Sequence, residues 1–252
     1  MKIKLNIEYD GTKFFGWQKQ EGFISVQETI ENALSNIFRD EEIILFGAGR
    51  TDTGVHAINQ VAHFEILSPK YIEKWEYNCN KLPLAINFYM HDTGCVVKKS
   101  EVVDDDFHAR FSARQRHYEY IIYNSYINSP IYKNRVWHVP QKLDIEKMRE
   151  ASKYLIGTHN LESFRSSECQ AKNPIRTIDF IEIIQKNEMI FIEIGAKSFL
   201  HNQVRITTGT LKQVGIHKMQ PEYIKFLIDQ KDRKLSGPTA PPYGLYFKNV
   251  IY

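Results

Sequence analysis

Apolar and polar side chains alternate over residues 2–9. The apolar ones occupy every second position, at Ile3, Leu5, Ile7 and Tyr9. A period of two is typical of a strand with one buried face. The Asp10-Gly11 pair that follows is typical of a turn. We therefore expect the chain to open with a strand that ends at this pair.

A helical period begins after Ser25. Ser25 and Glu28 form a Ser-x-x-Glu capping box, and the apolar residues around them lie on one helical stripe: Val26, Ile30, Ala33, Leu34, Ile37 and Phe38. This pattern predicts a helix. Related patterns predict helices over residues 70–81, from Asp144 onward, over about 200–216, and from Pro221 to about residue 230.

Short apolar or alternating runs predict the other strands. They cover residues 43–46, 60–66, 115–123, 176–186, 189–196 and 245–251, with two further candidates at 85–90 and 95–97. Strands that pair with strands and are interrupted by helices predict an α+β fold of two similar halves, each with helices on one side of its sheet. We place the boundary at the acidic residues 104–106, between an N-terminal domain of residues 1–105 and a C-terminal domain of residues 106–252.

The composition is that of a folded protein. Of the 252 residues, 42% are hydrophobic, 13% are aromatic and 25% are charged, which argues against disorder. No apolar run approaches the roughly 18 residues that cross a bilayer. The first ten residues alternate charged and apolar side chains, unlike a secretory signal. We therefore expect a cytoplasmic protein that is not embedded in a membrane.

No metal site is expected from the metal-binding residue types. The cysteines Cys79, Cys95 and Cys169 are odd in number and widely spaced, which fits neither a disulfide framework nor a paired Cys-x-x-Cys zinc site. The nine histidines show no His-Glu-x-x-His or other ligand spacing. The cysteines are therefore expected to be reduced thiols in the core.

A glycine-rich segment, residues 47–54, joins two predicted strands and carries one acid, Asp52. Its glycines, Gly47, Gly49 and Gly54, indicate backbone with positive φ angles. Such a turn can project the carboxylate of Asp52 into a cleft, with Arg50 near enough to keep it ionised as a nucleophile or base. The alternative is a hairpin loop in which Asp52 only bonds nearby amides. A dinucleotide-binding loop is excluded, because Asp52 takes the place of the third glycine and no helix follows.

Asp10 is a second candidate acid. The segment Glu8-Tyr9-Asp10-Gly11-Thr12 resembles the signature of the haloacid dehalogenase phosphatases, in which an aspartyl nucleophile precedes x-Asp-Gly-Thr. Here Glu8 occupies the position of that nucleophile, and the chemistry requires an acyl phosphate on the aspartate. A strand followed by a turn is the better interpretation. A metal-dependent phosphohydrolase that uses Asp10 is kept as a rival function.

Arginines and aromatic rings are interleaved over residues 107–123. The stretch contains three arginines, Arg110, Arg114 and Arg116, and three tyrosines, Tyr118, Tyr120 and Tyr123. It is either a solvated strand edge or a surface that holds an unstacked base against phosphates.

Arg205 flanks an apolar stripe formed on its predicted helix by Leu200, Val204 and Leu211. An arginine there is either a rim residue whose head group reaches water or a buried cation that needs a carboxylate. In the second case Asp52 is the natural partner.

Eight segments together resemble the tRNA pseudouridine synthases of the TruA type, in the order of that family. They are E8-Y-D-G-T-K-F-F-G-W-Q18, S25-V-Q-E28, G47-A-G-R-T-D-T-G-V-H-A57, D106-F-H-A-R-F-S-A113, R116-H-Y-E-Y-I-I-Y-N124, G157-T-H-N-L-E-S-F-R165, F199-L-H-N-Q-V-R205 and T239-A-P-P-Y-G-L-Y246. The segments span nearly the whole chain. The sequence departs from the family pattern at Thr207 and Thr208, where apolar residues are more usual, and this change concerns helix packing more than chemistry.

The resemblance implies a pseudouridine synthase fold, in which two ferredoxin-like halves form a mixed, mainly antiparallel central sheet flanked by helices, with the active site in the cleft between the halves. It also implies a homodimer that binds tRNA and isomerises uridine to pseudouridine at positions 38, 39 and 40 of the anticodon stem-loop. This reaction exchanges a C–N bond for a C–C bond within one nucleotide, so no cofactor and no metal are expected. A second rival function is a tRNA-binding protein that has kept the fold and lost the activity.

The resemblance also implies roles for individual residues. Asp52 is expected to be the nucleophile or general base that breaks the glycosidic bond of a flipped-out uridine. Tyr118 is expected to stack on the target base, and Arg205 is expected to pair with Asp52 and keep it ionised. Arg50 is expected to occupy the space left by the flipped nucleotide or to bind its phosphate. Further RNA contacts are expected from four arginines: Arg110, Arg114, Arg116 and Arg165.

Overall fold

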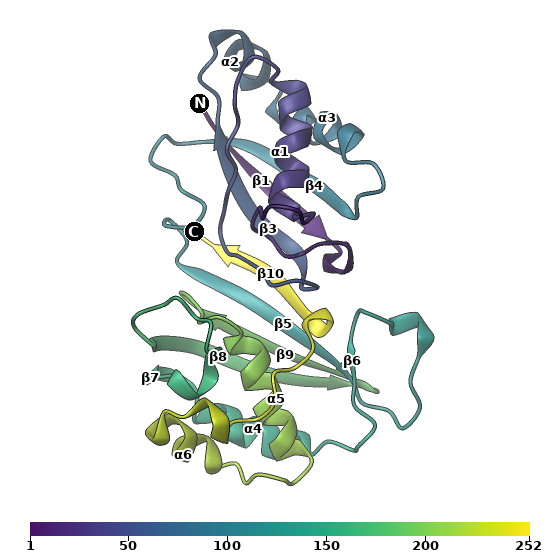
Figure 1. Ribbon diagram of the computed structural model, residues 1–252, viewed down its shortest axis with the longest axis vertical. Coiled ribbons are helices and arrows are strands. Elements are labelled where there is room, and N and C mark those ends of the chain that lie inside the picture. Colours follow the sequence, from purple (N-terminus) through teal and green to yellow (C-terminus); the bar gives the residue numbers. More distant parts are fainter. The chain divides into compact units, whose positions relative to one another are not determined.

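Ten β-strands and six α-helices are present in the computed structural model, which describes residues 1–252 (Figure 1). Strands and helices are mixed along the chain, which confirms the α+β class. Contacts within the chain divide it into a first unit, Met1–Arg114 with Phe247–Tyr252, and a second unit, Gln115–Tyr246. The domain boundary that the sequence predicts between residues 105 and 106 stays a prediction.

The sheet of the first unit is built around β1 (Lys2–Tyr9). This strand lies between two antiparallel neighbours, β3 (His56–Glu65) and β4 (Cys95–Val103). Its inward-facing side chains Ile3, Leu5 and Ile7 have no exposed surface, as the alternating pattern predicts. β3 begins at residue 56 rather than at residue 60, so the strand starts directly after the glycine-rich loop.

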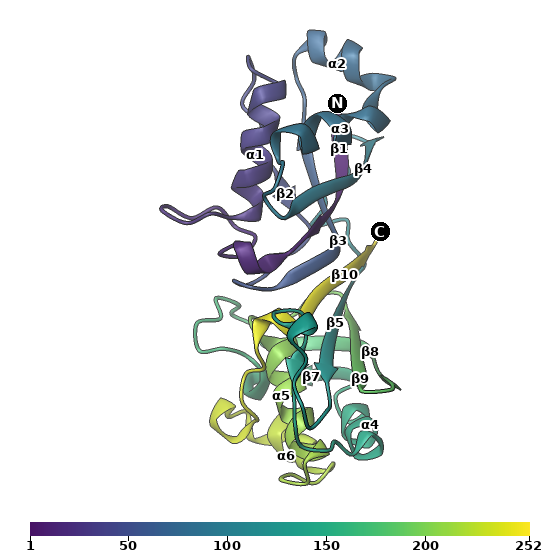
Figure 2. The same cartoon turned by 90° about the vertical axis from the view of Figure 1, so that its right-hand side faces the viewer.

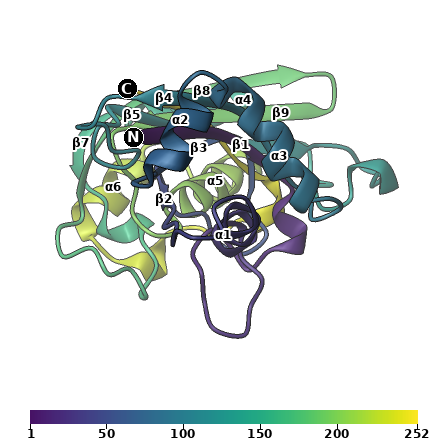
Figure 3. The ribbon, with the colours of Figure 1, turned by 90° about the horizontal axis from the view of Figure 1, so that it is seen from above.

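Three helices belong to the first unit: α1 (Val26–Ile37), α2 (Pro69–Glu76) and α3 (Leu82–Tyr89). The predicted cap of α1 is confirmed, because the side-chain oxygen of Ser25 accepts a hydrogen bond from the N–H of Glu28 at 3.2 Å. α1 is seen nearly end-on in Figure 3. It contacts α3, and α3 contacts β4, so both helices are attached to the same sheet (Figure 2).

The strand predicted at residues 43–46 is largely absent, because β2 is confined to Phe46–Gly47. The backbone of Leu45 is bonded to side chains of α1 instead of to a neighbouring strand. Its N–H donates to Glu31 at 3.1 Å, and its carbonyl oxygen accepts from the Gln27 amide at 3.2 Å. The helix therefore satisfies backbone groups that a sheet would otherwise satisfy.

The strand predicted at residues 85–90 is also wrong. Residues 85–89 belong to α3, and Met90 is its C-cap. The helix has Pro83 in its first turn, where the missing N–H costs nothing. A short apolar run alone does not distinguish a buried strand from a helix. The signal that favours a helix here is Pro83, because proline is favoured in the first turn of a helix.

The sheet of the second unit is antiparallel in the order β5 (Gln115–Tyr123), β9 (Met189–Ala196), β8 (Ile175–Lys186) and β7 (Gly157–Asn160). The short strand β6 (Trp137–His138) pairs with β5 in parallel, which makes the sheet mixed. β5, β8 and β9 confirm the strands that were predicted at these positions.

Three helices cover this sheet: α4 (Ile145–Lys153), α5 (Gln203–Gly215) and α6 (Tyr223–Gln230). α4 contacts β8, α5 contacts β5, and α4 also contacts both other helices (Figure 1). The Asp144 carboxylate caps α4 by accepting from the N–H of Lys147 at 3.1 Å. α6 begins two residues after Pro221, which is therefore not its first residue.

The last strand, β10 (Leu245–Ile251), confirms the predicted strand at these residues. It begins in the second unit and ends in the first. None of the helices combines the length and the apolar character that a membrane span requires.

Candidate active site

Asp52 is half-buried in the loop between β2 and β3. Of the three glycines in this loop, only Gly54 has a positive φ angle, at 79°. The expectation of positive φ at Gly47 and Gly49 is therefore wrong. Gly47 is needed for a different reason, since a Cβ atom there would lie 2.5 Å from the ring of Trp17. The loop is thus packed closely against a neighbouring aromatic side chain.

Residues 9–17 of the first unit hold this loop in place. The Tyr9 hydroxyl lies 2.8 Å from the Thr51 hydroxyl, and both side chains are buried. The N–H of Trp17 donates to the carbonyl oxygen of Thr51 at 3.0 Å. Burial raises the pKa of the Tyr9 phenol, so the hydroxyl is neutral at pH 7. The residue before Asp52 is therefore bonded through both its side chain and its backbone.

Gly16 allows the two segments to approach each other. Its φ angle is 88°, and a Cβ atom there would lie 2.7 Å from the carbonyl oxygen of Thr51 and 3.3 Å from the carbonyl carbon of Asp52. Any larger residue would be strained in its own backbone and would also press on the loop. Glycine is therefore required by both the conformation and the contact.

Hydrogen bonds within the first unit also hold the backbone on both sides of Asp52. The N–H of Ala48 donates to Val61, in β3, at 2.7 Å, and the side-chain amide of Gln60 donates to the Gly49 carbonyl at 3.0 Å. After the acid, the N–H of Val55 donates to the Asp52 carbonyl at 3.1 Å. These bonds limit the positions that the Asp52 carboxylate can occupy, which suits a group that reacts from a fixed place.

In the second unit, Tyr118 lies on β5 opposite Ile194 of β9 and is half-buried. Its ring makes an edge-to-face contact with Phe199, with 5.2 Å between the ring centroids and an angle of 88° between the planes. This contact orients the Tyr118 ring.

Tyr120 does not offer the exposed ring that a base-stacking surface needs. Its side chain has no exposed surface, and its hydroxyl donates to the carbonyl oxygen of Pro241 at 2.8 Å. Gly244 makes room for the ring, because a Cβ atom at that residue would lie 2.7 Å from it. Burial raises the pKa of Tyr120 well above its usual value, and the charge of Arg205 opposes this rise. Tyr120 is therefore a buried neighbour of Arg205.

Arg205 lies in the first turn of α5 and is half-buried. Its Nε donates to the carbonyl oxygen of Ala240 at 2.8 Å, and its Nη1 donates to Asn202 Oδ1 at 2.6 Å. The N–H of Ala240 donates back to the carbonyl oxygen of Arg205 at 3.1 Å. Asn202 has a φ angle of 60°, which asparagine adopts more readily than most residues. The guanidinium is therefore positioned within the second unit.

The apolar stripe beside Arg205 is confirmed, because Leu200, Val204 and Leu211 are buried, although Leu200 precedes the helix. The two threonines that depart from the family pattern, Thr207 and Thr208, are buried as well. The Thr208 hydroxyl donates to the carbonyl oxygen of Val204 at 2.9 Å, so the helix itself satisfies this polar group.

The arginines that were predicted to contact RNA differ in exposure. Arg50, Arg110 and Arg114 have exposed side chains. Arg116 is buried, and its Nη1 donates to the carbonyl oxygen of Lys197.

Arg165 is half-buried and engaged within the second unit. Its Nε and Nη2 lie 2.7 and 2.6 Å from Glu162 Oε1, and its Nη1 donates to the carbonyl oxygen of Ala171 at 2.9 Å.

Two histidines build the turn that carries Arg110. His108 Nδ1 accepts from the N–H of Arg110 at 3.1 Å, and the buried His63 accepts at Nδ1 from the N–H of Ala109 at 3.2 Å. The two imidazole rings are 4.6 Å apart, and the ring of Phe46 stacks on His63 at 5.3 Å. Burial and nearby positive charge lower the pKa of His63 to about 4, so its ring is neutral at pH 7 and able to accept this bond.

Asp10 has the structural role of a turn residue. Its carboxylate accepts from the N–H of Thr12 at 3.0 Å and from the Thr12 hydroxyl, and it caps the short 3-10 helix Gly11–Lys13. The interpretation of this segment as a strand followed by a turn is confirmed.

No group of three or more His, Cys, Asp or Glu side chains is placed to hold a metal ion. The three cysteines are not in disulfides, and Cys79 and Cys95 are buried. Burial raises the pKa of Cys95 to about 12, so it is a neutral thiol at pH 7. The expectation that the protein needs neither a metal nor a cofactor stays a prediction.

Sequence reasoning missed the residues that position the candidate groups. They are Tyr9, Gly16 and Trp17 for the Asp52 loop, and Asn202 and Ala240 for Arg205. All five lie in the segments that carry the family resemblance. That clustering was the only signal in the sequence, because hydrogen bonds between distant segments leave no periodic pattern.

The model of a family described as tRNA pseudouridine synthase matches residues 6–112 and 151–252. The tRNA pseudouridine synthase A of Wolbachia pipientis wMel is 49% identical over 253 residues, which cover 100% of both chains. The proteins of the same name from Ehrlichia canis strain Jake and Anaplasma phagocytophilum strain HZ are 45% and 43% identical, with the same coverage. A crystal structure of a Cbf5-Nop10-Gar1 complex matches 90% of this chain and 61% of that chain at 11% identity, with a TM-score of 0.35.

Proposed function

Because the chain belongs to the tRNA pseudouridine synthase family, we propose that it isomerises uridine to pseudouridine at positions 38, 39 and 40 in the anticodon stem-loop of tRNA. The observation that carries this proposal is the similarity to tRNA pseudouridine synthase A over the full length of the chain. The hydrogen bonds that fix the loop around Asp52 are consistent with this proposal. In the reaction the bond between N1 and C1′ breaks, the base turns and a bond forms between C5 and C1′. The proton on C5 is released and N1 takes up a proton, so the product is an isomer of the substrate.

In this proposal Asp52 is the nucleophile or general base that starts the cleavage of the glycosidic bond. The support is its place in the segment G47-A-G-R-T-D-T-G-V-H-A57 and the bonds that fix the loop on both sides of it. A carboxylate that is already in position does not lose further freedom when it reacts.

Tyr118 is proposed to stack on the flipped uridine. Flipping a base out of a stem costs a few kcal/mol, and stacking on one aromatic ring returns about 1–3 kcal/mol. The edge-to-face contact with Phe199 supports this role, since a ring that is already oriented loses less freedom when a base stacks on it.

Arg205 is proposed to pair with Asp52 and keep its carboxylate ionised. The family resemblance is the ground for this pairing. The bonds to Asn202 and Ala240 are consistent with it, because they hold the guanidinium in one orientation.

The proposed RNA contacts of the other arginines depend on their surroundings. Arg50, Arg110 and Arg114 are exposed and suit phosphate binding. Arg116 and Arg165 already donate to internal acceptors. Any RNA contact of these two must use the guanidinium N–H groups that remain, since arginine has five.

We also propose that the protein acts in the cytoplasm as a homodimer and uses no metal or cofactor. The homodimer and the cytoplasmic location rest on the family resemblance. The absence of a cofactor rests on the chemistry, because the isomerisation transfers no electrons and needs no second substrate.

The test is to incubate the protein with an unmodified tRNA transcript and to map pseudouridine by carbodiimide labelling and primer extension. We expect new stops one nucleotide 3′ of positions 38, 39 or 40, wherever the transcript has a uridine at these positions. A transcript with cytidine at these positions is the control and should give no stop there. Stops confined to other parts of the tRNA would contradict the proposed positions of modification. A tRNA that carries no pseudouridine after the incubation would contradict the proposed activity.

A further inference from the structure

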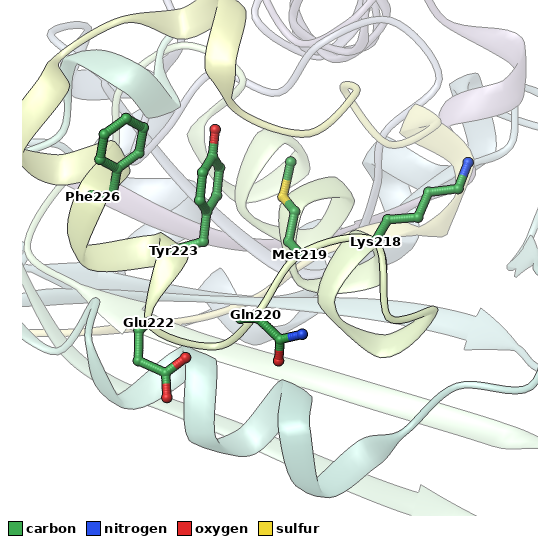
Figure 4. Close-up of a pocket in the computed structure, with 6 residues that line it drawn as sticks. All are labelled: Lys218, Met219, Gln220, Glu222, Tyr223 and Phe226. Atoms are coloured by element: carbon green, nitrogen blue, oxygen red, sulfur yellow. The ribbon is translucent and has the colours of Figure 1, made fainter.

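A surface recess lies where the second unit turns from α5 into α6 (Figure 4). Its volume is about 590 Å³, within the range of small-ligand sites. It is lined by six residues: Lys218, Met219, Gln220, Glu222, Tyr223 and Phe226. None of them has a role in the proposed reaction.

One side of the recess is aromatic. Figure 4 shows Phe226, Tyr223 and Met219 side by side and projecting in the same direction, while Gln220 and Glu222 project the opposite way. The rings of Tyr223 and Phe226 are 5.1 Å apart between centroids, with 34° between their planes. The Phe226 side chain is 42% exposed. Partly exposed rings of this kind are surfaces on which nucleobases stack without regard to sequence.

Positive charge lies at the end of this aromatic row. Lys218 follows Met219 in the row and is exposed (Figure 4). Burial, and then the charge of Lys218, lower the pKa of Lys212. Neither ammonium has a carboxylate or another hydrogen-bond acceptor in the structure. An exposed lysine at the recess, with a second lysine whose pKa its charge lowers, favours an anion such as a phosphate.

We propose that this recess is a second RNA contact, in which an unpaired base of the tRNA stacks on Phe226 and Tyr223 while Lys218 contacts the phosphate of that nucleotide. This inference rests on the proposed function, which supplies tRNA as the ligand. An apolar protein segment could pack on the two rings, but it would offer no negative charge to Lys218 or Lys212. Charge complementarity therefore favours RNA.

The bound nucleotide is not the reacting uridine. Arg205 lies in the first turn of α5, and the recess follows the other end of the helix. At 1.5 Å per residue, α5 rises about 15 Å between Arg205 and Gly215. The recess therefore contributes to the affinity and placement of the tRNA rather than to the chemical step.

The test compares tRNA binding by four variants of the full chain. Phe226→Ala removes the exposed ring, and Phe226→Tyr keeps a ring and checks that the fold is intact. Lys218→Gln removes the charge, and Lys225→Gln is the matched control, because Lys225 is an exposed lysine on α6 that does not line the recess. Affinity for full-length tRNA is measured by fluorescence anisotropy over a range of salt concentrations.

We expect Phe226→Ala to weaken tRNA binding roughly five- to tenfold, and Phe226→Tyr to bind almost like wild type. Lys218→Gln should lower the slope of log affinity against log salt by about one, as for one lost phosphate contact. Lys225→Gln should leave the slope unchanged. Wild-type affinity in both Phe226→Ala and Lys218→Gln would overturn the inference, and so would a change in oligomeric mass in place of a change in RNA binding.

The same samples are assayed for pseudouridine. Wild type that forms no pseudouridine contradicts the proposed function. Normal pseudouridine formation together with unchanged tRNA affinity in the variants overturns only the second contact.

Discussion

Two hydrogen bonds to Thr51 determine where the neighbouring Asp52 can lie. The Tyr9 hydroxyl is hydrogen-bonded to the Thr51 hydroxyl, and the N–H of Trp17 donates to the carbonyl oxygen of Thr51. Each bond contributes only about 1 kcal/mol to stability. Their larger effect is on position, because a reacting group must be held within a fraction of an ångström.

At Tyr118 the proposed role depends on the ring and not on the hydroxyl. Tyr118→Phe keeps the stacking surface, whereas Tyr118→Ala removes it. We therefore expect kcat/KM on tRNA to fall much further in Tyr118→Ala, by roughly 10- to 100-fold relative to Tyr118→Phe, given about 1–3 kcal/mol per stacked base. Equal losses in the two variants would show that stacking is not what Tyr118 contributes.

The contact between residues 9–17 and the Asp52 loop can be tested with a matched pair of glycines. Gly16 and Gly22 both have positive φ angles, 88° and 79°, but a Cβ atom at Gly22 would meet nothing within 4 Å. Gly16→Ala should cost about 1–3 kcal/mol of stability through backbone strain alone, and it should also lower turnover, because it presses on the carbonyl of Thr51. Gly22→Ala should lose a similar amount of stability through backbone strain but should keep the turnover of wild type.

Urea unfolding gives the stability of each variant, and initial rates on tRNA give its turnover. If Gly22→Ala lost as much turnover as Gly16→Ala, the contact with the loop would have no special effect on activity.

The turn around Arg110 makes the stability of the first unit depend on pH. Burial, and then the charges of His108 and Lys2, lower the pKa of His63 from 6.5 to about 4. Between these two values the unfolded chain binds more protons than the folded chain, so the free energy of unfolding falls as the pH falls from about 6.5 to about 4.

His63→Gln removes this titration and keeps an acceptor for the N–H of Ala109. We expect it to lose less stability than wild type when urea unfolding is compared at pH 7 and pH 5. Part of the pH dependence should remain, because the pKa of His108 is lowered as well. An identical loss in both proteins would show that His63 is not the group responsible.

Elements with a strong local pattern could be predicted from the sequence. α1 has a cap and a stripe, and β1 and β5 have alternation, so each begins and ends close to its predicted residues. Residues 43–46 could not be predicted, because side chains of α1 bond the backbone of Leu45. The ring of Tyr120 was expected at the surface and is buried, since burial depends on Gly244 and Pro241 from a distant segment.

In the candidate site, too, some residues could be predicted from the sequence and others could not. Glycines and an acid in one short segment drew attention to Asp52, and an arginine beside an apolar stripe drew attention to Arg205. The residues that hold them, Tyr9 and Gly16 for one and Asn202 for the other, act across loops. Contacts of that kind are set by tertiary structure and have no spacing rule.

For the whole molecule, the proposed homodimer makes a simple prediction. Sedimentation equilibrium at micromolar concentration should give about twice the chain mass of 29.6 kDa. A mass of one chain at that concentration, in a sample that forms pseudouridine, would show that a single subunit is sufficient for the reaction.

The most direct test of the whole account is tritium release from tRNA labelled with [5-³H]uridine, with wild type and Asp52→Ala compared in EDTA. Formation of the C5 bond expels the label, so wild type should release tritium from the anticodon stem-loop without added metal. Asp52→Ala should release none and should still bind tRNA with nearly unchanged affinity. Release by Asp52→Ala at the wild-type rate, or a requirement of wild type for a metal ion, would contradict the account.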